Sequence, residues 1–503
     1  MKRIIKIAEH YSTLAEDLNI PFGYFILAFM SFVAIRNLLE IFSDGSKMAV
    51  ITFDGHFHFY LFYACMALTM MLLFSALTGV HMNKIARLIL FSFFFIFLAP
   101  ILDLLISGGR GYNMAYLLPD KHGDLPLRYL TFAGAFHTMG ITIGLKIEVA
   151  VMTIASFFYC KAKKMSTLKS LLSAWLMYTL IFIYAIVPFI IKAILDVFDL
   201  FEYFDSLLFA KFYLVLFFFL LLAVAYKWNN KIFNSLLDDV RPWRQMHALM
   251  MFVFGIILGP SLAWNQRTFF DIPVTMISIL WACLFVIMTN NLHDQEIDRW
   301  VNKKRPLINK TIAHGDYQNF AVGAGLLALA YAWVAGYYVF FTILLFMGLY
   351  SLYSMPPLRL KRVPFFSKLV IAVNSLAFAI MGYVLAGGEV IEFPPLVILW
   401  FLVFLTAAMN FIDLKDYKGD KRAGIQTLPV MWGLEKSQRV IGVFFLLAYL
   451  VAPLAVGEMI LLIPAIPAGA IQYWTITRKR YREQPVFSLY LTSFAVMLII
   501  LAL

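Results

Sequence analysis

The chain has 503 residues, of which 62% are hydrophobic and only 14% are charged, and its mean hydropathy is +0.82. This composition excludes a soluble globular protein and indicates a polytopic membrane protein. The net charge of +12 does not indicate nucleic-acid binding, because the lysines and arginines cluster in short loops between apolar segments, where they determine topology. The cysteines Cys65, Cys160 and Cys283 are too far apart in sequence for a metal motif, so we expect them in the core.

The first 233 residues contain about six apolar segments of roughly 17–25 residues, the length that crosses a membrane. The predicted spans are 22–42, 59–79, 88–106, 144–160, 171–195 and 208–226. Basic residues flank alternate ends of these spans, beginning with Lys2, Arg3 and Lys6, so the positive-inside rule predicts a cytoplasmic N-terminus. Residues 1–19 are polar and predict a surface helix rather than a cleavable signal peptide.

Charged residues inside this first part are few. Lys146 and Glu148 lie within the fourth predicted span, where a charge is costly in lipid, so we expect them to face a partner or water. Asp103, Arg110 and His137 complete a candidate pocket, although paired structural residues explain the same side chains more simply. No motif indicates a function here, and residues 1–233 are predicted to be a transmembrane domain of unknown role.

A polar linker at 227–244 leads into residues 234–503, which contain about nine further spans. The predicted spans are 247–264, 273–289, 320–336, 337–353, 365–386, 396–412, 440–456, 459–476 and 486–503. Basic residues again fall in alternate loops. The loops that follow the second, fourth and sixth of these spans are therefore predicted on the cytoplasmic side, and the C-terminus outside.

A cluster of amides and carboxylates closes the second span of this part. Asn290, Asp294 and Asp298 are spaced i, i+4, i+8, and Asn291 lies three and seven residues before the two aspartates, so on a helix these side chains share one face. Carboxylates stacked in this way repel one another unless a cation lies among them, and the end of a helix dipole adds to that preference. Hard oxygen ligands suit Mg²⁺, which binds through a few carboxylates together with a substrate's phosphates.

The same spacing recurs after a later span. Asp413, Asp416 and Asp420 repeat the spacing of Asn291, Asp294 and Asp298. Two such clusters at corresponding helix ends predict a site that holds one diphosphate between two metal ions. A single cluster is equally well explained as a solvated acidic loop, but two matched clusters favour the metal site.

Residues 290–298 resemble the Asn-Asp-x-x-Asp-x-x-x-Asp motif of the UbiA-type intramembrane prenyltransferases, and residues 416–420 resemble the second motif of that family, Asp-x-x-x-Asp. The flanking segments 241–243, 299–307, 353–361 and 424–430 are similar too, and the resemblance covers 238–503. One residue departs from the pattern, because the family's first aspartate is Asn291 here. A neutral amide oxygen is a weaker ligand, so the first metal site is expected to depend on Asp294 and Asp298.

The resemblance implies an all-α polytopic membrane protein, in which a nine-helix UbiA-type bundle follows an extra bundle of about six transmembrane helices. It implies Mg²⁺-dependent transfer of an isoprenyl group from a polyprenyl diphosphate to an acceptor such as an aromatic ring, a glycerol phosphate or another lipid precursor. The expected location is a bacterial or archaeal-type cell membrane, with the active site on the cytoplasmic side among membrane lipids and no nucleic acid as partner.

Roles for individual residues follow from the same resemblance. Catalysis is assigned to Asp294, Asp298, Asp416 and Asp420. The expected metal ligands are Asn291, Asp294, Asp298, Asp413, Asp416 and Asp420. The expected diphosphate contacts are Asn290, Arg305, Arg359, Lys361, Lys421 and Arg422. The isoprenoid tail is expected among aromatic side chains such as Phe378, Tyr383, Trp400 or Phe404.

Two alternatives stay open at this point. The same metal–diphosphate site would serve transfer of a phosphoribosyl group from a soluble diphosphate donor to a polyprenyl phosphate. A lipid transporter or scaffold would use the carboxylates for pairing or gating, although it has no need for two matched clusters beside arginines and lysines. His293 either assists a proton or a metal, or is a solvated flanking residue. The hydropathy excludes a soluble prenyl diphosphate synthase.

Overall fold

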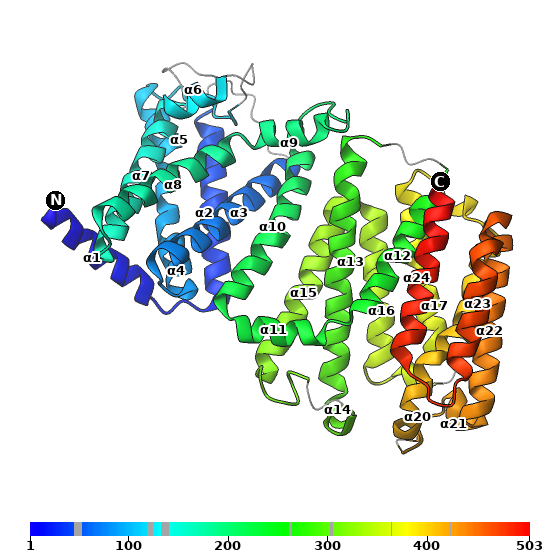
Figure 1. Cartoon of the computed structure of the whole chain (residues 1–503). Helices are drawn as coiled ribbons and strands as arrows, with labels where there is room; N and C mark the ends of the chain where they lie inside the picture. The colour runs from blue at the N-terminus through cyan, green and yellow to red at the C-terminus, as the bar shows by residue number, and fades with distance from the viewer. Residues whose placement is uncertain are drawn as a thin grey trace. The chain divides into compact units, whose positions relative to one another are not determined.

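The computed structural model describes residues 1–44, 53–117, 124–131, 140–260, 264–301, 305–363, 365–422 and 424–503. Over these residues the chain is helical and has no β-strand beyond an isolated bridge between Met114 and Gly140, which confirms the predicted all-α fold. Two compact units are present (Figure 1). The first comprises residues 1–233 with 265–270, and the second comprises residues 234–264 with 271–503.

The first unit contains six apolar helical segments long enough to cross a membrane, counted over its described residues. Its elements are α1 (Lys2–Asp17), α2 (Phe22–Phe42), α3 (Phe53–Thr78), α4 (Met82–Ser92), η1 (Phe93–Phe97), α5 (Leu98–Ile106), α6 (Leu125–Leu130), α7 (Ile143–Ala162), α8 (Thr167–Ala185), α9 (Val187–Asp196) and α10 (Ser206–Trp228). The segment predicted as one span at 171–195 is two helices, α8 and α9. The break precedes Pro188, which lacks an amide hydrogen and restricts the residue before it.

Buried carboxylates connect α5 and α7 within this unit. Asp103 of α5 accepts a hydrogen bond from the Gly144 amide at the start of α7 (2.8 Å), and Glu148 of α7 accepts one from the Ala99 amide at the start of α5 (3.0 Å). Each carboxylate therefore satisfies an amide that its neighbour's first turn leaves without a helical partner. The expectation that Glu148 faces a partner is confirmed, Arg110 is exposed, and His137 lies outside the described residues.

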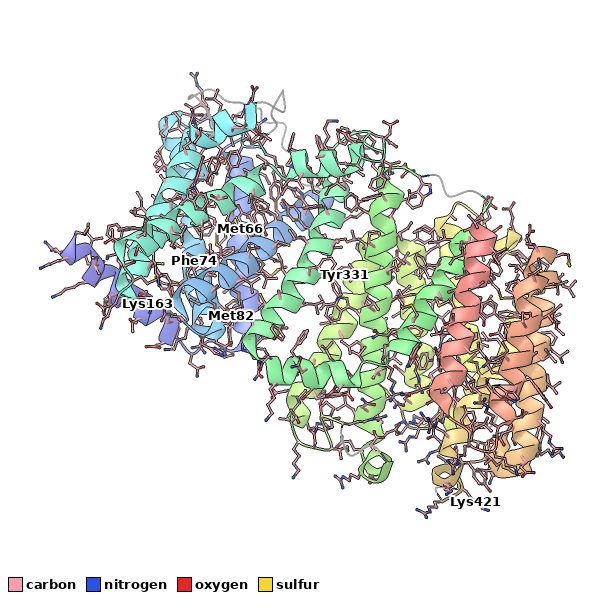
Figure 2. All side chains as sticks on the ribbon, viewed as in Figure 1. Met66, Phe74, Met82, Lys163, Tyr331 and Lys421 are labelled. Carbon is pink, nitrogen blue, oxygen red and sulfur yellow. The ribbon has the colours of Figure 1, made fainter. Side chains whose placement is uncertain are left out.

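The core of the first unit is apolar and aromatic. Figure 2 labels three of its buried side chains, Met66, Phe74 and Met82. The predicted surface helix is α1, most of whose side chains are exposed, and its buried Glu16 forms an ion pair with Lys163 just after α7 (2.7 Å). Cys65 and Cys160 are buried and unbridged, as is Cys283 of the second unit, which confirms that the cysteines are core residues.

The second part of the chain is a longer series of helices. Its elements are α11 (Asn230–Asp239), α12 (Pro242–Leu258), α13 (Gln266–His293), α14 (Gln295–Val301), α15 (His314–Ala335), α16 (Tyr337–Ser354), η3 (Leu360–Arg362), α17 (Phe366–Leu385), η4 (Val390–Glu392), α18 (Pro395–Trp400), η5 (Phe401–Leu405), α19 (Thr406–Ala408), η6 (Met409–Ile412), α20 (Asp413–Arg422), α21 (Leu428–Trp432), α22 (Leu434–Val456), η7 (Met459–Leu461), α23 (Leu462–Thr477) and α24 (Glu483–Ala502). Across the whole described chain, 14 helical segments are long and apolar enough to span a membrane, so this is an integral membrane protein. Helix α12, at 17 residues, is shorter than these and ends before the predicted boundary at 264.

Helices α12 and α17 pack with their backbones in close approach. A Cβ atom on Gly255 would lie 1.8 Å from the Ala379 carbonyl oxygen, and one on Gly382 would lie 2.0 Å from the Phe252 carbonyl oxygen. Between membrane helices, where the surrounding lipid is itself apolar, small residues stabilise association by permitting such contact. The start of α12 lies beside the first carboxylate cluster, and the start of α17 lies beside the second.

The path into the second carboxylate cluster is not a regular helix. The segment predicted as one span at 396–412 consists of α18, a π-helical turn (η5), α19 and a 3₁₀ turn (η6) before α20 begins. Such π-helical turns within helices frequently occur at functional sites. In the second unit, α14 and α20 lie at the same end, whereas the C-terminus lies at the opposite end (Figure 1).

Candidate functional site

The first cluster lies where α13 gives way to α14. Asp294 separates the two helices, yet the Asp294 amide donates to the Asn290 carbonyl (3.0 Å) and the Asp298 amide donates to the Asp294 carbonyl (2.9 Å). The helical hydrogen-bond pattern therefore continues through the junction. The side chains separate into two pairs, Asn290 with Asp294 and Asn291 with Asp298, and each pair has its own cations.

Asn290 and Asp294 bind cations from the loop between α16 and α17. The Lys361 ammonium lies 2.5 and 2.6 Å from the two Asp294 carboxylate oxygens and 3.2 Å from the Asn290 amide oxygen. Arg359, in the left-handed backbone region at φ 43°, places a guanidinium nitrogen 3.3 Å from Asp294. Burial lowers the pKa of Lys361, and the Asp294 carboxylate opposes that shift. A negative group at this point is therefore favourable.

Asn291 and Asp298 bind two other arginines. One Arg305 nitrogen donates to the Asn291 amide oxygen (2.8 Å) and also to the Asp298 carboxylate, and Arg241 donates to the same Asn291 oxygen (3.2 Å). Burial lowers the pKa of Arg241, and the neighbouring Arg244 and Arg305 guanidinium groups lower it further. Because an arginine side chain stays charged in proteins, the unfavourable burial and repulsion favour an anion beside it.

The second cluster occupies α20. The Asp413 carboxylate accepts from the Lys368 ammonium of α17 (2.6 Å), and their side chains are only 12% and 5% exposed. Asp420 accepts from the Thr427 hydroxyl (3.4 Å) and experiences repulsion from Asp413 and Asp416. Asp294 and Asp298 are largely buried as well, at 14% and 5% side-chain exposure, whereas Asp416 and Asp420 are half-buried.

Two predicted diphosphate contacts are exposed side chains. Lys421 and Arg422 are exposed in the last turn of α20, and Figure 2 shows Lys421 at the tip of this helix. The Lys421 ammonium lies over the Tyr417 ring, 5.9 Å from its centroid. The other predicted contacts, Asn290, Arg305, Arg359 and Lys361, are all brought to the first cluster.

Arg244 connects the two clusters electrostatically. Its guanidinium interacts with Arg241 beside the first cluster and with Asp416 and Lys368 in the second. Arg241 and Arg244 are three residues apart at the start of α12, so they share a face of that helix. The two carboxylate clusters thus lie at one end of the second unit with cationic side chains between them.

The carboxylates do not form a closed metal cage. No group of three or more His, Cys, Asp or Glu side chains in the described parts of the chain is arranged as a metal site. The oxygen donors nevertheless suit a hard cation, because the three carboxylates of α20 repel one another. Of these three, Lys368 donates a hydrogen bond only to Asp413. In the first cluster each carboxylate is already paired with a lysine or an arginine.

Comparison with known sequences identifies this part of the chain. Residues 248–495 match the sequence model of the UbiA prenyltransferase family. The C-terminal half belongs to that family. It is therefore a prenyltransferase domain, and the interpretation as a lipid transporter or scaffold falls away.

Relatives of the UbiA domain differ in their acceptors. Digeranylgeranylglyceryl phosphate synthase of Thermococcus sibiricus is 28% identical over 269 residues, covering 51% of this chain and 94% of that protein. Homogentisate phytyltransferase of Synechocystis sp. is 30% identical over 190 residues, covering 35% of this chain and 60% of that protein. A UbiA homolog from Archaeoglobus fulgidus, solved with GPP and Mg²⁺, aligns with a TM-score of 0.45 at 19% identity over 53% of this chain and 96% of that one.

Several residues of the UbiA domain site were not predicted from sequence. Asp239, Tyr317 and Lys368 contact the clusters from α11, α15 and α17, and no local spacing relates them to either motif. Arg244 was detectable in principle, because it lies three residues after Arg241 on the same helix. His293 is exposed and bonds the Thr289 carbonyl through its ring (2.8 Å), in agreement with a flanking role.

The predicted tail-binding aromatics of the UbiA domain are mostly core residues. Phe378, Tyr383 and Trp400 are buried, and Phe404 is half-buried. Trp400 also lines an apolar cavity of about 40 Å³ together with Phe254, Phe445 and Tyr490. A cavity that holds one water molecule needs about 10–15 Å³ measured in the same way, so side chains must move before this cavity admits a prenyl chain.

Proposed function

We propose that the protein transfers an isoprenyl group from a polyprenyl diphosphate to an acceptor within the membrane, in a reaction that requires Mg²⁺. The observation that carries this proposal is the meeting of two carboxylate clusters and an interleaved set of cations at one end of the second unit. The acceptor is an aromatic ring, a glycerol phosphate or another lipid precursor. The relatives named homogentisate phytyltransferase and digeranylgeranylglyceryl phosphate synthase support the first two of these classes.

The cationic side chains of the first cluster bind the diphosphate. Lys361, Arg359 and Arg305 form ion pairs with Asp294 and Asp298, and a phosphate of the donor would replace these carboxylates as their partner. Arginine suits this role because its planar guanidinium forms two parallel charge-assisted hydrogen bonds with phosphate.

Asp294 and Asp298 of the first cluster, with Asp413, Asp416 and Asp420 of the second, are the side chains that would hold Mg²⁺. When bound there, Mg²⁺ would neutralise negative charge on the departing diphosphate. The apolar interior of the bundle excludes water from the allylic carbon, and the faces of aromatic rings stabilise its positive charge until the acceptor attacks.

We also propose that residues 1–233 form a separate transmembrane domain and that the site faces the cytoplasm, with the N-terminus inside and the C-terminus outside. The alternation of basic loops supports this orientation. The position of the C-terminus at the end of the second unit opposite α14 and α20 agrees with it (Figure 1).

The test replaces one carboxylate from each cluster. Asp294→Ala and Asp416→Ala should each abolish prenyl transfer in membranes supplied with prenyl diphosphate and Mg²⁺, while both purified proteins remain folded. Glu296→Ala is the matched control, because Glu296 is an exposed acid of α14 next to the cluster. Near-normal turnover by either aspartate variant at limiting Mg²⁺ would contradict the two-cluster site.

The rival reaction is separated by its donor. A phosphoribosyl transferase consumes a water-soluble ribosyl diphosphate and leaves a polyprenyl phosphate glycosylated, whereas a prenyltransferase releases inorganic diphosphate from a lipid donor. Mass spectrometry of the lipids formed by wild type and Asp294→Ala membranes, supplied with either donor, distinguishes the two.

A further inference from the structure

The amide of Asn291 uses both of its ends in a buried hydrogen-bond network. Its oxygen accepts from Arg305 (2.8 Å) and Arg241 (3.2 Å), and its nitrogen donates to the Tyr317 hydroxyl (3.0 Å). The Tyr317 hydroxyl in turn donates to the Asp239 carboxylate (2.7 Å). Asn291, Tyr317 and Asp239 are 2%, 0% and 5% exposed, so water does not replace these partners.

The direction of every hydrogen bond in this network is determined by chemistry. Arginine only donates, so the amide oxygen of Asn291 must face Arg241 and Arg305, and the amide nitrogen must face Tyr317. The hydroxyl of Tyr317 has a single proton, which it donates to Asp239. Position 291 must therefore supply a donor to the hydroxyl oxygen, which an aspartate at this position cannot do.

An aspartate at 291, the residue that the family's motif has there, would leave two carboxylates competing for one hydroxyl proton. One of them would then be buried without a hydrogen bond on that side, which is strongly unfavourable for a charged group. The network instead contains one carboxylate, on Asp239, and one neutral amide. Its negative charge lies on α11, outside the motif.

We propose that Asp239 carries the negative charge that the family's motif places at position 291. Asn291 is then a positioning residue for Arg241 and Arg305 rather than a metal ligand. Arg305 also donates to Asp298, so the amide determines where this guanidinium lies relative to a carboxylate of the first cluster. The consequence for catalysis rests on the proposed prenyl transfer, but the network itself does not.

The decisive experiment exchanges the two residues. Asn291→Asp alone sets two carboxylates on one hydroxyl proton, whereas Asp239→Asn alone keeps an acceptor for Tyr317 but removes the negative charge that interacts with Arg305 and Arg241. Each single variant should therefore lower the unfolding midpoint and raise the KM for prenyl diphosphate, roughly 10-fold or more. In the double variant Asn291→Asp/Asp239→Asn, the new amide at 239 donates to Tyr317 and Tyr317 donates to the new carboxylate at 291. The double variant should therefore recover most of both losses, with KM within about threefold of the wild type.

Tyr317→Phe provides the internal check, since without the hydroxyl the exchange should no longer rescue either single variant. Asn319→Asp is the matched control, because Asn319 is an exposed residue of the same helix, α15. Unfolding midpoints of the full-length protein in detergent with EDTA report on the network without metal or turnover.

The outcomes divide cleanly. If Asn291→Asp alone keeps the wild-type midpoint in EDTA and binds Mg²⁺ more tightly, position 291 is a metal ligand and the proposal is wrong. A double variant no better than the worse single variant refutes the relocation of charge. If all variants, wild type included, lack prenyl transfer, the proposed function fails, while the pattern of midpoints in EDTA still decides whether the network is as described.

Discussion

The ion pair between Lys368 and Asp413 makes a quantitative test of the second cluster possible. The two charged groups lie 2.6 Å apart with side chains 5% and 12% exposed, which corresponds to an attraction of roughly 6 kcal/mol at an effective dielectric constant of about 20. Much of this attraction offsets the cost of burying both charges. Removing one partner of such a pair nevertheless costs about 3–5 kcal/mol, because the other charge stays buried and unpaired.

Lys368→Met keeps most of the length of the side chain and removes its charge. In EDTA this variant should lose about 3–5 kcal/mol of stability, because Asp413 loses its hydrogen-bonded ammonium while the other carboxylates of α20 stay beside it. A divalent cation at the cluster takes over the role of the ammonium, so Mg²⁺ should restore a large part of the loss. The measurement is the thermal unfolding of the detergent-purified full chain, with EDTA and with saturating Mg²⁺.

The control for this experiment is Lys415→Met. Lys415 also belongs to α20 and pairs with Glu483 at 2.5 Å, but its side chain is 44% exposed, and such surface pairs contribute at most about 1 kcal/mol. A Lys368→Met variant as stable in EDTA as Lys415→Met would refute the argument from burial. A destabilised variant that Mg²⁺ does not rescue would show that Asp413 does not bind the cation.

Three further predictions follow from the second unit. Gly255→Ala should destabilise the protein by about 1–3 kcal/mol in thermal unfolding, because its Cβ would meet the α17 backbone at 1.8 Å, whereas Gly348→Ala, with open space at its Cβ, should not. Burial lowers the pKa of Lys361, so its ammonium should lose its proton at a lower pH than an exposed lysine does. The KM for prenyl diphosphate should therefore rise as the pH is raised from neutral towards about 10. Lys361→Arg, which stays charged, should remove that rise. A protein that begins at Asn234 should bind a non-hydrolysable prenyl diphosphate analogue, since every residue assigned to the diphosphate follows residue 238. A folded fragment that fails to bind would contradict the domain proposal.

The sequence alone was sufficient to predict the class of fold and both carboxylate clusters. Membrane helices must bury their own backbone polar groups, so long apolar segments identify them without tertiary information. The spacing of Asp294 and Asp298, and of Asp413 and Asp420, is likewise a local property. A helix has about 3.6 residues per turn, so residues four or seven apart lie on the same face. The predicted topology is also local in origin, because it follows from the count of lysines and arginines in each short loop.

The partners of those carboxylates were decided only by the tertiary structure. Lys368 comes to Asp413 from 45 positions earlier in the chain, and Asp239 reaches Asn291 through Tyr317, so no spacing along the sequence indicates either contact. Lys421 and Arg422 show the converse, because they adjoin the second motif in sequence and yet lie exposed at the end of α20. Charges close in sequence are separated by the direction in which a helix projects them, and charges distant in sequence meet because the packing of α12, α15 and α17 brings their ends together.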